Sequence, residues 1–224
     1  MKSRELLIFD VNETLLDLKP VQESVGSVLE GRRELVPLWF TTMLHYSLVT
    51  TATGKYQDFV EIGVAALIMT AIKYDIILSK EEALAAIKPI LNLSPHTDVI
   101  PALYTLKEAG FRMVTLTNSS KIGVATQIKY AGLTDFFEQL LSVEEIGIYK
   151  PHTRVYEWAA GKLNAAPGNC TMVAAHSWDV AGAHRAGMKT AFIARPGQHL
   201  FPAFPTPGMV VPDFSKLADK LLEL

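Results

Sequence analysis

The sequence predicts an α/β fold, a parallel sheet wrapped by helices, with an all-helical insertion after the first strand. Two patterns predict it. From about residue 97 to residue 224, short apolar runs alternate with helical patterns, which is typical of a parallel sheet. Between residues 18 and 96, apolar residues recur every three or four positions with no convincing strand. We therefore expect a core domain formed by residues 1–17 and 97–224 and a helical domain formed by residues 18–96.

The first expected strand is the apolar run LLIF at residues 6–9, whose polar flanks are typical of a strand buried on both faces. The helical insertion follows, and Gly31, Gly54 and Ser79 separate its segments. These segments are VQESVGSVLEG, LVPLWFTTMLHYSLVTTATG, YQDFVEIGVAALIMTAIKY and KEEALAAIKPIL.

Helices and strands alternate in the rest of the chain. We expect helices in VIPALYTLKEAG, KIGVATQIKYAG, HTRVYEWAAGKL and WDVAGAHRAG. We expect strands in RMVTLT, near LLSVEE, in TMVAA and in TAFIA. The proline-rich tail, residues 196–212, is predicted to be a loop, and Asp213 is expected to open a final helix.

Composition favours a small-molecule partner. The chain has 224 residues, 49% of them hydrophobic, and a net charge of −2 with no basic stripe, so we expect neither a nucleic-acid nor a membrane partner. Cys170 is the one cysteine, which excludes an internal disulfide framework. The N-terminal apolar run is too short for a secretory signal, and no uninterrupted stretch reaches the roughly 18 apolar residues of a membrane span. We expect a soluble, cytoplasmic protein.

Polar residues stand where the expected strands end. Ligands of open parallel sheets bind beyond the carboxyl ends of the strands, so we expect these residues to meet at one site. The helical insertion starts beside the first of them and could close over all of them, which would exclude water. The residues are Asp10 and Thr14, then Thr117, Asn118 and Ser119, then Lys150, and finally His176, Ser177 and Asp179.

Each of these residues also has a plainer explanation. Asn118 and Ser120 precede a helix and could cap it. Asp179 stands in the first turn of a helix, where the macrodipole favours a negative charge. Lys150 could be a solvated side chain. Their order is the stronger signal, because an aspartate, a Thr-Asn pair, a Lys-Pro pair and a second aspartate each follow a strand in turn.

Four segments resemble the motifs of the haloacid dehalogenase superfamily, and their residues are most similar to those of its type II 2-haloacid dehalogenases. They are FDVNETLLD, LTNSS, YKPHTRVYEWA and VAAHSWDVAGAHRAGMKTAFIAR. The insertion stretch WFTTMLHYSLVTTATGKYQDFVEIGVAAL is also similar to the helical cap of that family. The resemblance implies a modified Rossmann core with a small helical cap, in agreement with the layout above.

The resemblance implies a hydrolase that uses Asp10 as a covalent nucleophile and needs no cofactor. Asp10 would displace halide from the α-carbon of a small carboxylate, and water would then attack the aspartyl ester. Lys150 would keep Asp10 ionised and Thr14 would orient it by hydrogen bonding. Asp179 and Lys150 would hold the attacking water.

Further residues are expected at the substrate. Thr117 and Asn118 match the family's Ser-Asn pair and would receive the substrate carboxylate. Tyr156 matches an active-site tyrosine, although packing on the sheet explains it equally well. Phe59 and Trp178 also match the family pattern.

The chain departs from the family pattern at several positions. Asn12 replaces a tyrosine, Phe40 replaces the cap arginine that binds halide and carboxylate, and Ala174 replaces a serine. His176 stands where the family has the asparagine of its halide cradle. We hypothesise that a protonated His176 holds a small halide and that a cation of the cap approaches the substrate. The candidate cations are Arg32, Arg33 and His45.

Two other functions are compatible with the motifs. A magnesium-dependent phosphatase of the same superfamily would carry Asp at the position of Asn12 and at Ala175, and the chain has neither. A non-catalytic binding protein would have no use for the charges of Asp10, Lys150 and Asp179. A homodimer contact through cap residues such as Met43 and Met69 is a further expectation.

Overall fold

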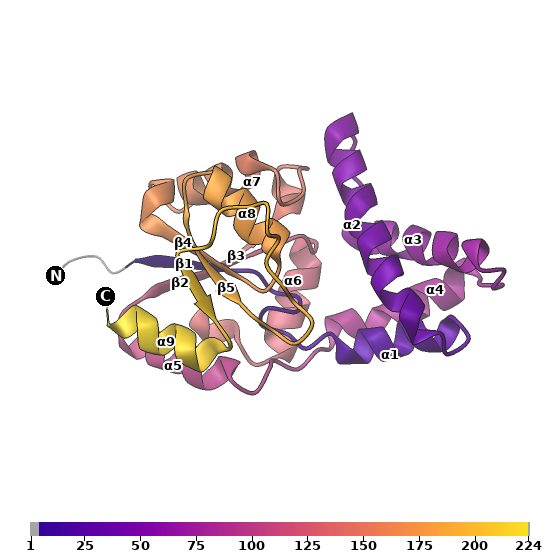
Figure 1. Ribbon diagram of the computed structural model, residues 1–224, viewed down its shortest axis with the longest axis horizontal. Coiled ribbons are helices and arrows are strands. Elements are labelled where there is room, and N and C mark those ends of the chain that lie inside the picture. Colours follow the sequence, from indigo (N-terminus) through magenta and orange to yellow (C-terminus); the bar gives the residue numbers. More distant parts are fainter. Residues whose placement is uncertain (1–4, 224) are drawn as a thin grey trace.

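Within the residues that the computed structural model describes, 5–223, six parallel strands form one sheet in the order β3-β2-β1-β4-β5-β6 (Figure 1). β1 lies at the centre and pairs with β2 and β4, so that Phe9 is level with Thr115 and Val173. The strands are β1 (Leu6–Phe9), β2 (Arg112–Thr117), β3 (Gln139–Ser142), β4 (Cys170–Ala174), β5 (Lys189–Ile193) and β6 (Met209–Val211).

Helices cover both faces of this sheet. α5 and α9 lie side by side on one face, and α7 and α8 lie on the other (Figure 1). Each strand from β1 to β4 is followed by a helical segment before the next strand, and a loop over residues 194–208 joins β5 to β6. The helices of this part are α5 (Val99–Glu108), α6 (Lys121–Tyr130), α7 (Thr153–Lys162), α8 (Ser177–Arg185) and α9 (Phe214–Leu222).

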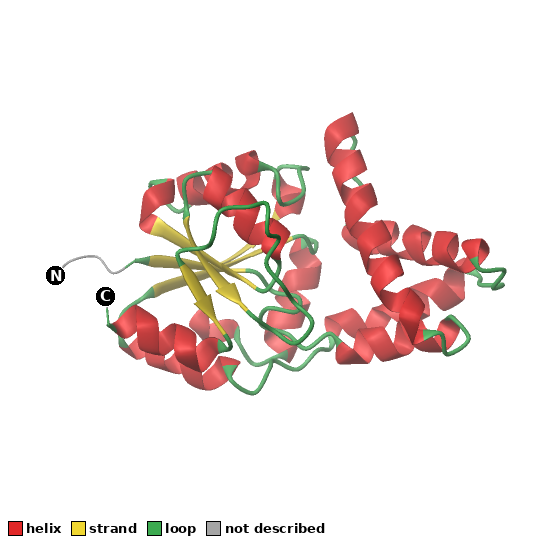
Figure 2. Cartoon of the chain, in the orientation of Figure 1, coloured by secondary structure: helices red, strands yellow, loops and turns green. Residues whose placement is uncertain are grey.

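The chain between β1 and α5 is helical and stands beside the sheet, on the side to which the strand arrowheads point (Figure 2). α2 is its longest helix and packs along α3. The helices are α1 (Lys19–Val28), α2 (Val36–Thr53), α3 (Phe59–Lys73) and α4 (Lys80–Ile87), which continues as a 3-10 helix over Lys88–Leu91. The exact domain boundaries, 17/18 and 96/97, stay a proposal.

Several helices begin or end at the residues that the sequence analysis predicts. Gly54 ends α2 with a positive φ of 70°, a conformation that favours glycine. Ser79 opens α4 through a reciprocal capping box with Glu82. Asp213 opens α9 by accepting a hydrogen bond from the Lys216 N–H. No helix of the described chain is long and apolar enough to cross a membrane.

One expectation about the core is wrong, and one strand ends earlier than its sequence segment. The tail 196–212 is not a loop throughout, because Met209–Val211 forms β6 and pairs with β5. This edge strand has only three residues, too few to show a period. The strand near LLSVEE ends at Ser142, and Val143–Glu145 forms a 3-10 helix whose Glu144 N–H donates to the Ser142 hydroxyl.

Gly182 brings α8 against the turn that follows Lys150. A Cβ at this position would lie 2.5 Å from the carbonyl oxygen of Pro151 and 2.8 Å from Cε2 of Tyr156. Gly161 on α7 provides the contrast, because a Cβ there meets nothing within 4 Å.

We expect Gly182→Ala to lower the free energy of unfolding by about 1–3 kcal/mol, because backbone must shift to admit the methyl group. Gly161→Ala is the matched control and should be neutral or slightly stabilising, since alanine favours helix by roughly 1 kcal/mol over glycine. Urea unfolding of both variants measures this. Equal stability of Gly182→Ala and the wild type would contradict the close packing.

Candidate active site

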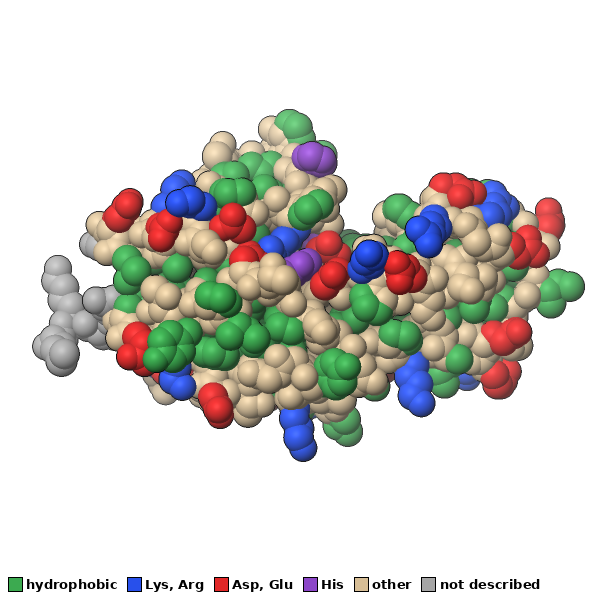
Figure 3. Space-filling model, turned by 90° about the horizontal axis from the view of Figure 1, so that it is seen from below, with side chains coloured by type: hydrophobic (Ala, Val, Ile, Leu, Met, Phe, Trp, Pro, Cys, Tyr) green, Lys and Arg blue, Asp and Glu red, His purple; other side chains and the backbone are tan. Residues whose placement is uncertain are grey.

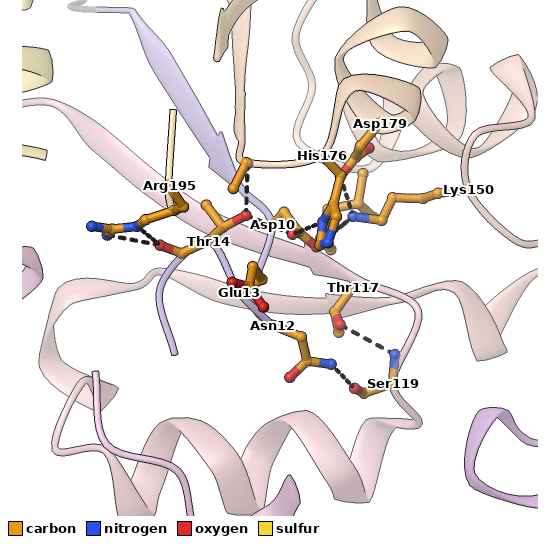
Figure 4. Close-up of polar contacts among 12 residues, drawn as sticks. Asp10, Asn12, Glu13, Thr14, Thr117, Ser119, Lys150, His176, Asp179 and Arg195 are labelled. Atoms are coloured by element: carbon orange, nitrogen blue, oxygen red, sulfur yellow. Dashed lines mark hydrogen bonds and ion pairs between the residues drawn. The ribbon is translucent and has the colours of Figure 1, made fainter. Parts of the chain in front are cut away.

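Asp10 lies at the end of the central strand and is almost buried. Its backbone N–H continues the sheet by donating to Val173 O at 3.0 Å, and the residue is 4% exposed. Its carboxylate is held from two sides: the Thr14 hydroxyl donates to Oδ2 at 2.7 Å, and Lys150 Nζ donates to Oδ1 at 2.8 Å (Figure 4). The carboxylate is therefore fixed in orientation before any ligand binds.

Lys150 is a fully buried cation, not a solvated side chain. Its ammonium group donates to Asp10 Oδ1 at 2.8 Å, to Asp179 Oδ2 at 2.6 Å and to the carbonyl oxygen of Leu116 at 2.9 Å. The side chains of Lys150 and Asp179 are both 0% exposed. Because an ammonium group has three donors, all of them are used.

Burial and their mutual charges set the pKa values of Asp10, Lys150 and Asp179. Burial alone would raise the pKa of Asp10, but Lys150 and the hydrogen bond from His176 outweigh it and hold the pKa below its ordinary value. Burial opposes the charge of Lys150, yet Asp10 and Asp179 raise its pKa. Burial raises the pKa of Asp179, the charge of Lys150 only partly offsets this effect, and the charge of Asp10 adds to the rise. Asp10 is thus ionised beside a permanent ammonium group.

Tyr156 supports Asp179. Its hydroxyl donates to Asp179 Oδ1 at 2.6 Å, and burial, followed by the Asp179 charge, raises the pKa of Tyr156 well above its ordinary value. The residue is fully buried behind Asp179. The structure thus places this tyrosine on the carboxylate and not on the wall of the substrate cavity.

A cavity of about 930 Å³ opens between the sheet and helices α1–α4, where Figure 3 shows a notch in the surface. Thr14, Lys150, Asp179 and Tyr156 lie behind its floor, bonded to Asp10 or to one another. The residues expected at the site that line the cavity are Asp10, Asn12, Phe40, Phe59, Thr117, Asn118, His176 and Trp178.

His176 is held between two aromatic rings. Its imidazole stacks on Phe40, with ring centroids 6.0 Å apart, and on Trp178, at 5.0 Å. Nδ1 lies 3.3 Å from Asp10 Oδ2, and an ionised carboxylate only accepts, so Nδ1 carries the proton. Nε2 is buried with no partner among residues 5–223. Nε2 can therefore donate to a ligand only when the ring is an imidazolium.

Asn118 also presents an unused donor. Its Oδ1 accepts from the Lys150 backbone N–H at 3.1 Å, whereas its Nδ2 is buried and has no partner in the described part of the chain. The capping role belongs to Ser120, whose Oγ accepts from the Gly123 N–H. Buried polar atoms are normally paired, so an unpaired donor at a cavity wall indicates a place for a ligand acceptor.

Asn12 and Thr117 hold the loops around the cavity. Asn12 Nδ2 donates to Ser119 Oγ at 3.2 Å, and its Oδ1 accepts from Gln127 at 2.8 Å. Thr117 Oγ1 accepts from the Ser119 N–H at 3.1 Å. The Asn12–Ser119 bond joins the loop after β1 to the loop after β2, and the Gln127 bond ties Asn12 to α6.

Arg195 is a buried residue that the sequence analysis missed. It donates to the carbonyl oxygen of Thr14 at 3.0 Å and forms a bidentate pair with Asp98 at 2.8 and 2.9 Å. Asp98 in turn accepts from the Phe214 N–H. The available signal was its position just after β5, at the same sheet edge as the other polar residues.

Glu13 was missed as well, and no sequence signal identifies it. It lines the cavity with a positive φ of 65°. Burial raises the pKa of its carboxyl group. The nearby charge of Asp17 has the next-largest raising effect.

Of the three cap cations considered, Arg33 lines the cavity in the described structure. Arg32 instead donates to Glu34 and lies over the ring of Tyr74, 4.8 Å from its centroid. His45 packs edge-on against Tyr46. The missing cap arginine is therefore not replaced by Arg32 or His45.

A family model described as haloacid dehalogenase-like hydrolase matches residues 5–187, which include every site residue expected from the sequence. The chain belongs to this hydrolase family. Its relatives include (S)-2-haloacid dehalogenase 1 of Pseudomonas sp. (strain CBS-3), 31% identical over 84% of this chain and 83% of that protein. Haloacetate dehalogenase H-2 of Moraxella sp. (strain B) is 28% identical over 95% of each chain.

The fold of this hydrolase matches a solved dehalogenase. L-2-haloacid dehalogenase from Xanthobacter autotrophicus, with chloropropionic acid covalently bound, superposes with a TM-score of 0.88 over 98% of each chain at 23% identity. This likeness confirms the predicted α/β core with its inserted helices.

The residues of the site do not fit a resident magnesium ion. Divalent cations bind through several oxygen ligands, but Asp10 and Asp179 already share the Lys150 ammonium group, and Ala175 provides no carboxylate. In residues 5–223 no group of three or more His, Cys, Asp or Glu could hold a metal ion. The phosphatase alternative has no structural support.

Removing the buried cation should change how stability depends on pH. We expect Lys150→Met to lower the free energy of unfolding by about 3–5 kcal/mol near neutral pH, because two buried carboxylates lose their partner. Without the cation their pKa values rise, so the folded state binds more protons and the variant gains stability as pH falls from about 8 to about 5. In the wild type, the lowered pKa of Asp10 means that its contribution persists until pH falls below about 4.

Urea unfolding across this pH range measures the effect. Lys216→Met, which removes an exposed lysine bonded to Asp219, is the matched control and should change neither stability nor its pH dependence appreciably. A Lys150→Met variant that loses stability toward acid pH would contradict the shared-cation arrangement.

Proposed function

We propose that this hydrolase is a 2-haloacid dehalogenase that replaces halide by hydroxyl through an ester on Asp10, without a metal ion. One observation carries the proposal: an ionised carboxylate at the cavity floor has a buried ammonium group as its counter-ion. Unpaired N–H donors flank that carboxylate. The names of the relatives, (S)-2-haloacid and haloacetate dehalogenases, support the substrate class.

In the first step, a carboxylate oxygen of Asp10 attacks C2 of the substrate. The new C–O bond forms as the carbon–halogen bond breaks, and halide leaves with the bonding electrons from the opposite side of C2. Lys150 and Thr14 keep the carboxylate ionised and aimed. Because the carboxylate is nearly buried, it reacts without a full hydration shell.

The substrate is held by the two unpaired donors. Asn118 Nδ2 receives the substrate carboxylate, at the start of the loop before α6. His176 Nε2, as an imidazolium, receives the departing halide between the faces of Phe40 and Trp178. A charged donor in a dry pocket stabilises an anion strongly, which would compensate for the arginine that Phe40 replaces.

In the second step, water attacks Cγ of the Asp10 ester. The bond from Cγ to the substrate oxygen breaks, and the 2-hydroxy acid leaves with a proton while the Asp10 carboxylate is restored. Once Asp10 is esterified, the Lys150 ammonium group pairs with Asp179 alone. We assign Asp179 as the group that accepts the water proton, for which its raised pKa is suited.

Further expectations about the protein remain part of this proposal. We infer that it acts in the cytoplasm, binds no nucleic acid and forms a homodimer. Met43 is 3% exposed and cannot contribute to a dimer contact, whereas Met69, at 50%, is accessible.

The direct test of function follows two products in parallel after chelator treatment. We expect chloride or bromide release from chloroacetate and 2-bromopropanoate without added metal, and no phosphate release from small phosphate esters. Phosphate release restored by magnesium, with no halide from any 2-haloacid, would reject the proposal. Asp10→Asn is the matched inactive control.

The halide role of His176 predicts a loss of rate when its ring is removed. We expect His176→Ala to lower kcat for halide release about 100-fold, because it removes a donor at the developing anion. His45→Ala, on the cap but outside the cavity lining, is the control and should match the wild type. An unchanged kcat in His176→Ala would exclude His176 from the step.

A further inference from the structure

The cavity is much larger than a short haloacid requires. Its volume of about 930 Å³ is within the range of about 300–1,000 Å³ that is usual for sites of drug-sized ligands. A 2-haloacid of two or three carbons occupies about the volume of four waters, at about 30 Å³ each. Most of the cavity would stay unfilled by such a substrate.

The polar groups of the proposed reaction are confined to the cavity floor. Asp10, Asn118 and His176 are 4%, 5% and 4% exposed and follow β1, β2 and β4. The charged lining residues Lys19 and Arg33 are exposed, so they mark the mouth. Between the floor and the mouth, the cavity wall differs in polarity.

The wall on the cap side is apolar and available to a ligand. Phe40 and Leu44 from α2, Val60 from α3 and Ile90 from the 3-10 helix after α4 line the cavity and are only half-buried by the protein. Apolar side chains left partly uncovered inside a cavity gain free energy when an apolar group covers them. The cavity therefore suits a molecule with an anionic head and an apolar tail.

We propose that the preferred substrate is a 2-halocarboxylate with an apolar chain of about four or more carbons at C2. This inference rests on the proposed function. When the carboxylate is at Asn118 and the halide at His176, the remaining large substituent of C2 must extend away from the floor. It then runs along Phe40 and Leu44 toward the mouth, where Phe40 contributes an apolar face in place of a charge.

A chain-length series in the wild-type protein tests the inference. With racemic 2-bromopropanoate, 2-bromobutanoate and 2-bromohexanoate, we expect kcat/KM for bromide release to rise about fourfold per added methylene. A flat or falling series would overturn the inference and leave the proposed function intact. Absence of bromide from every member would instead contradict the proposed function.

Filling the cavity with a larger side chain should weaken the preference for the longer substrate. We expect Leu44→Trp to lower the ratio of kcat/KM for 2-bromohexanoate over 2-bromopropanoate at least tenfold, because indole occupies the space of the chain. Val49→Trp on the same helix, 37% exposed in the wild type and outside the cavity lining, is the matched control and should keep the wild-type ratio. An unchanged ratio in Leu44→Trp would place the chain elsewhere and overturn the inference.

Discussion

The ammonium group of Lys150, shared by two buried carboxylates, is the interaction on which the site depends. Asp10 and Asp179 are both buried and carry like charges, so neither could stay ionised without a cation. Lys150 reaches both at hydrogen-bond distance. Moving charged groups out of water costs free energy. Short hydrogen bonds from every donor of the ammonium group offset that cost. The arrangement yields a nucleophile that is ionised and desolvated at the same time.

The fold serves this interaction by bringing distant loops to one sheet edge. Asp10 continues β1, Lys150 lies after β3, and Asp179 lies in the first turn of α8 after β4. Arg195 lies at the same edge and donates to the Thr14 carbonyl oxygen (Figure 4). It also pairs with Asp98 and thereby fixes the loop that carries the Thr14 hydroxyl. Helices α1–α4 then supply an apolar wall above a polar floor. In this geometry, the proposed reaction takes place on residues of the core, and the proposed substrate selectivity comes from the cap.

Much of the core could be predicted because its signals are local. Strands buried on both faces read as apolar runs, and charged residues directly after them fall at the ligand edge whatever the details of packing. Tyr156 shows the limit, because periodicity indicates burial but not which buried atom accepts its hydrogen bond. The unpaired Nε2 of His176 and the positive φ of Glu13 depend on the three-dimensional surroundings, and no pattern of residues encodes them. β6 was missed because three residues are too few to show a period.

The central claim is that Asp10 bonds covalently to its substrate. A single turnover of 2-bromopropanoate in water enriched in oxygen-18, followed by mass measurement of the peptide that contains residue 10, tests it most directly. The account predicts that the label enters the Asp10 carboxylate and that the first product is unlabelled, because water attacks Cγ of the ester. Label in the hydroxyl group of the product, with none in that peptide, would show that water attacks the substrate directly and would contradict the account.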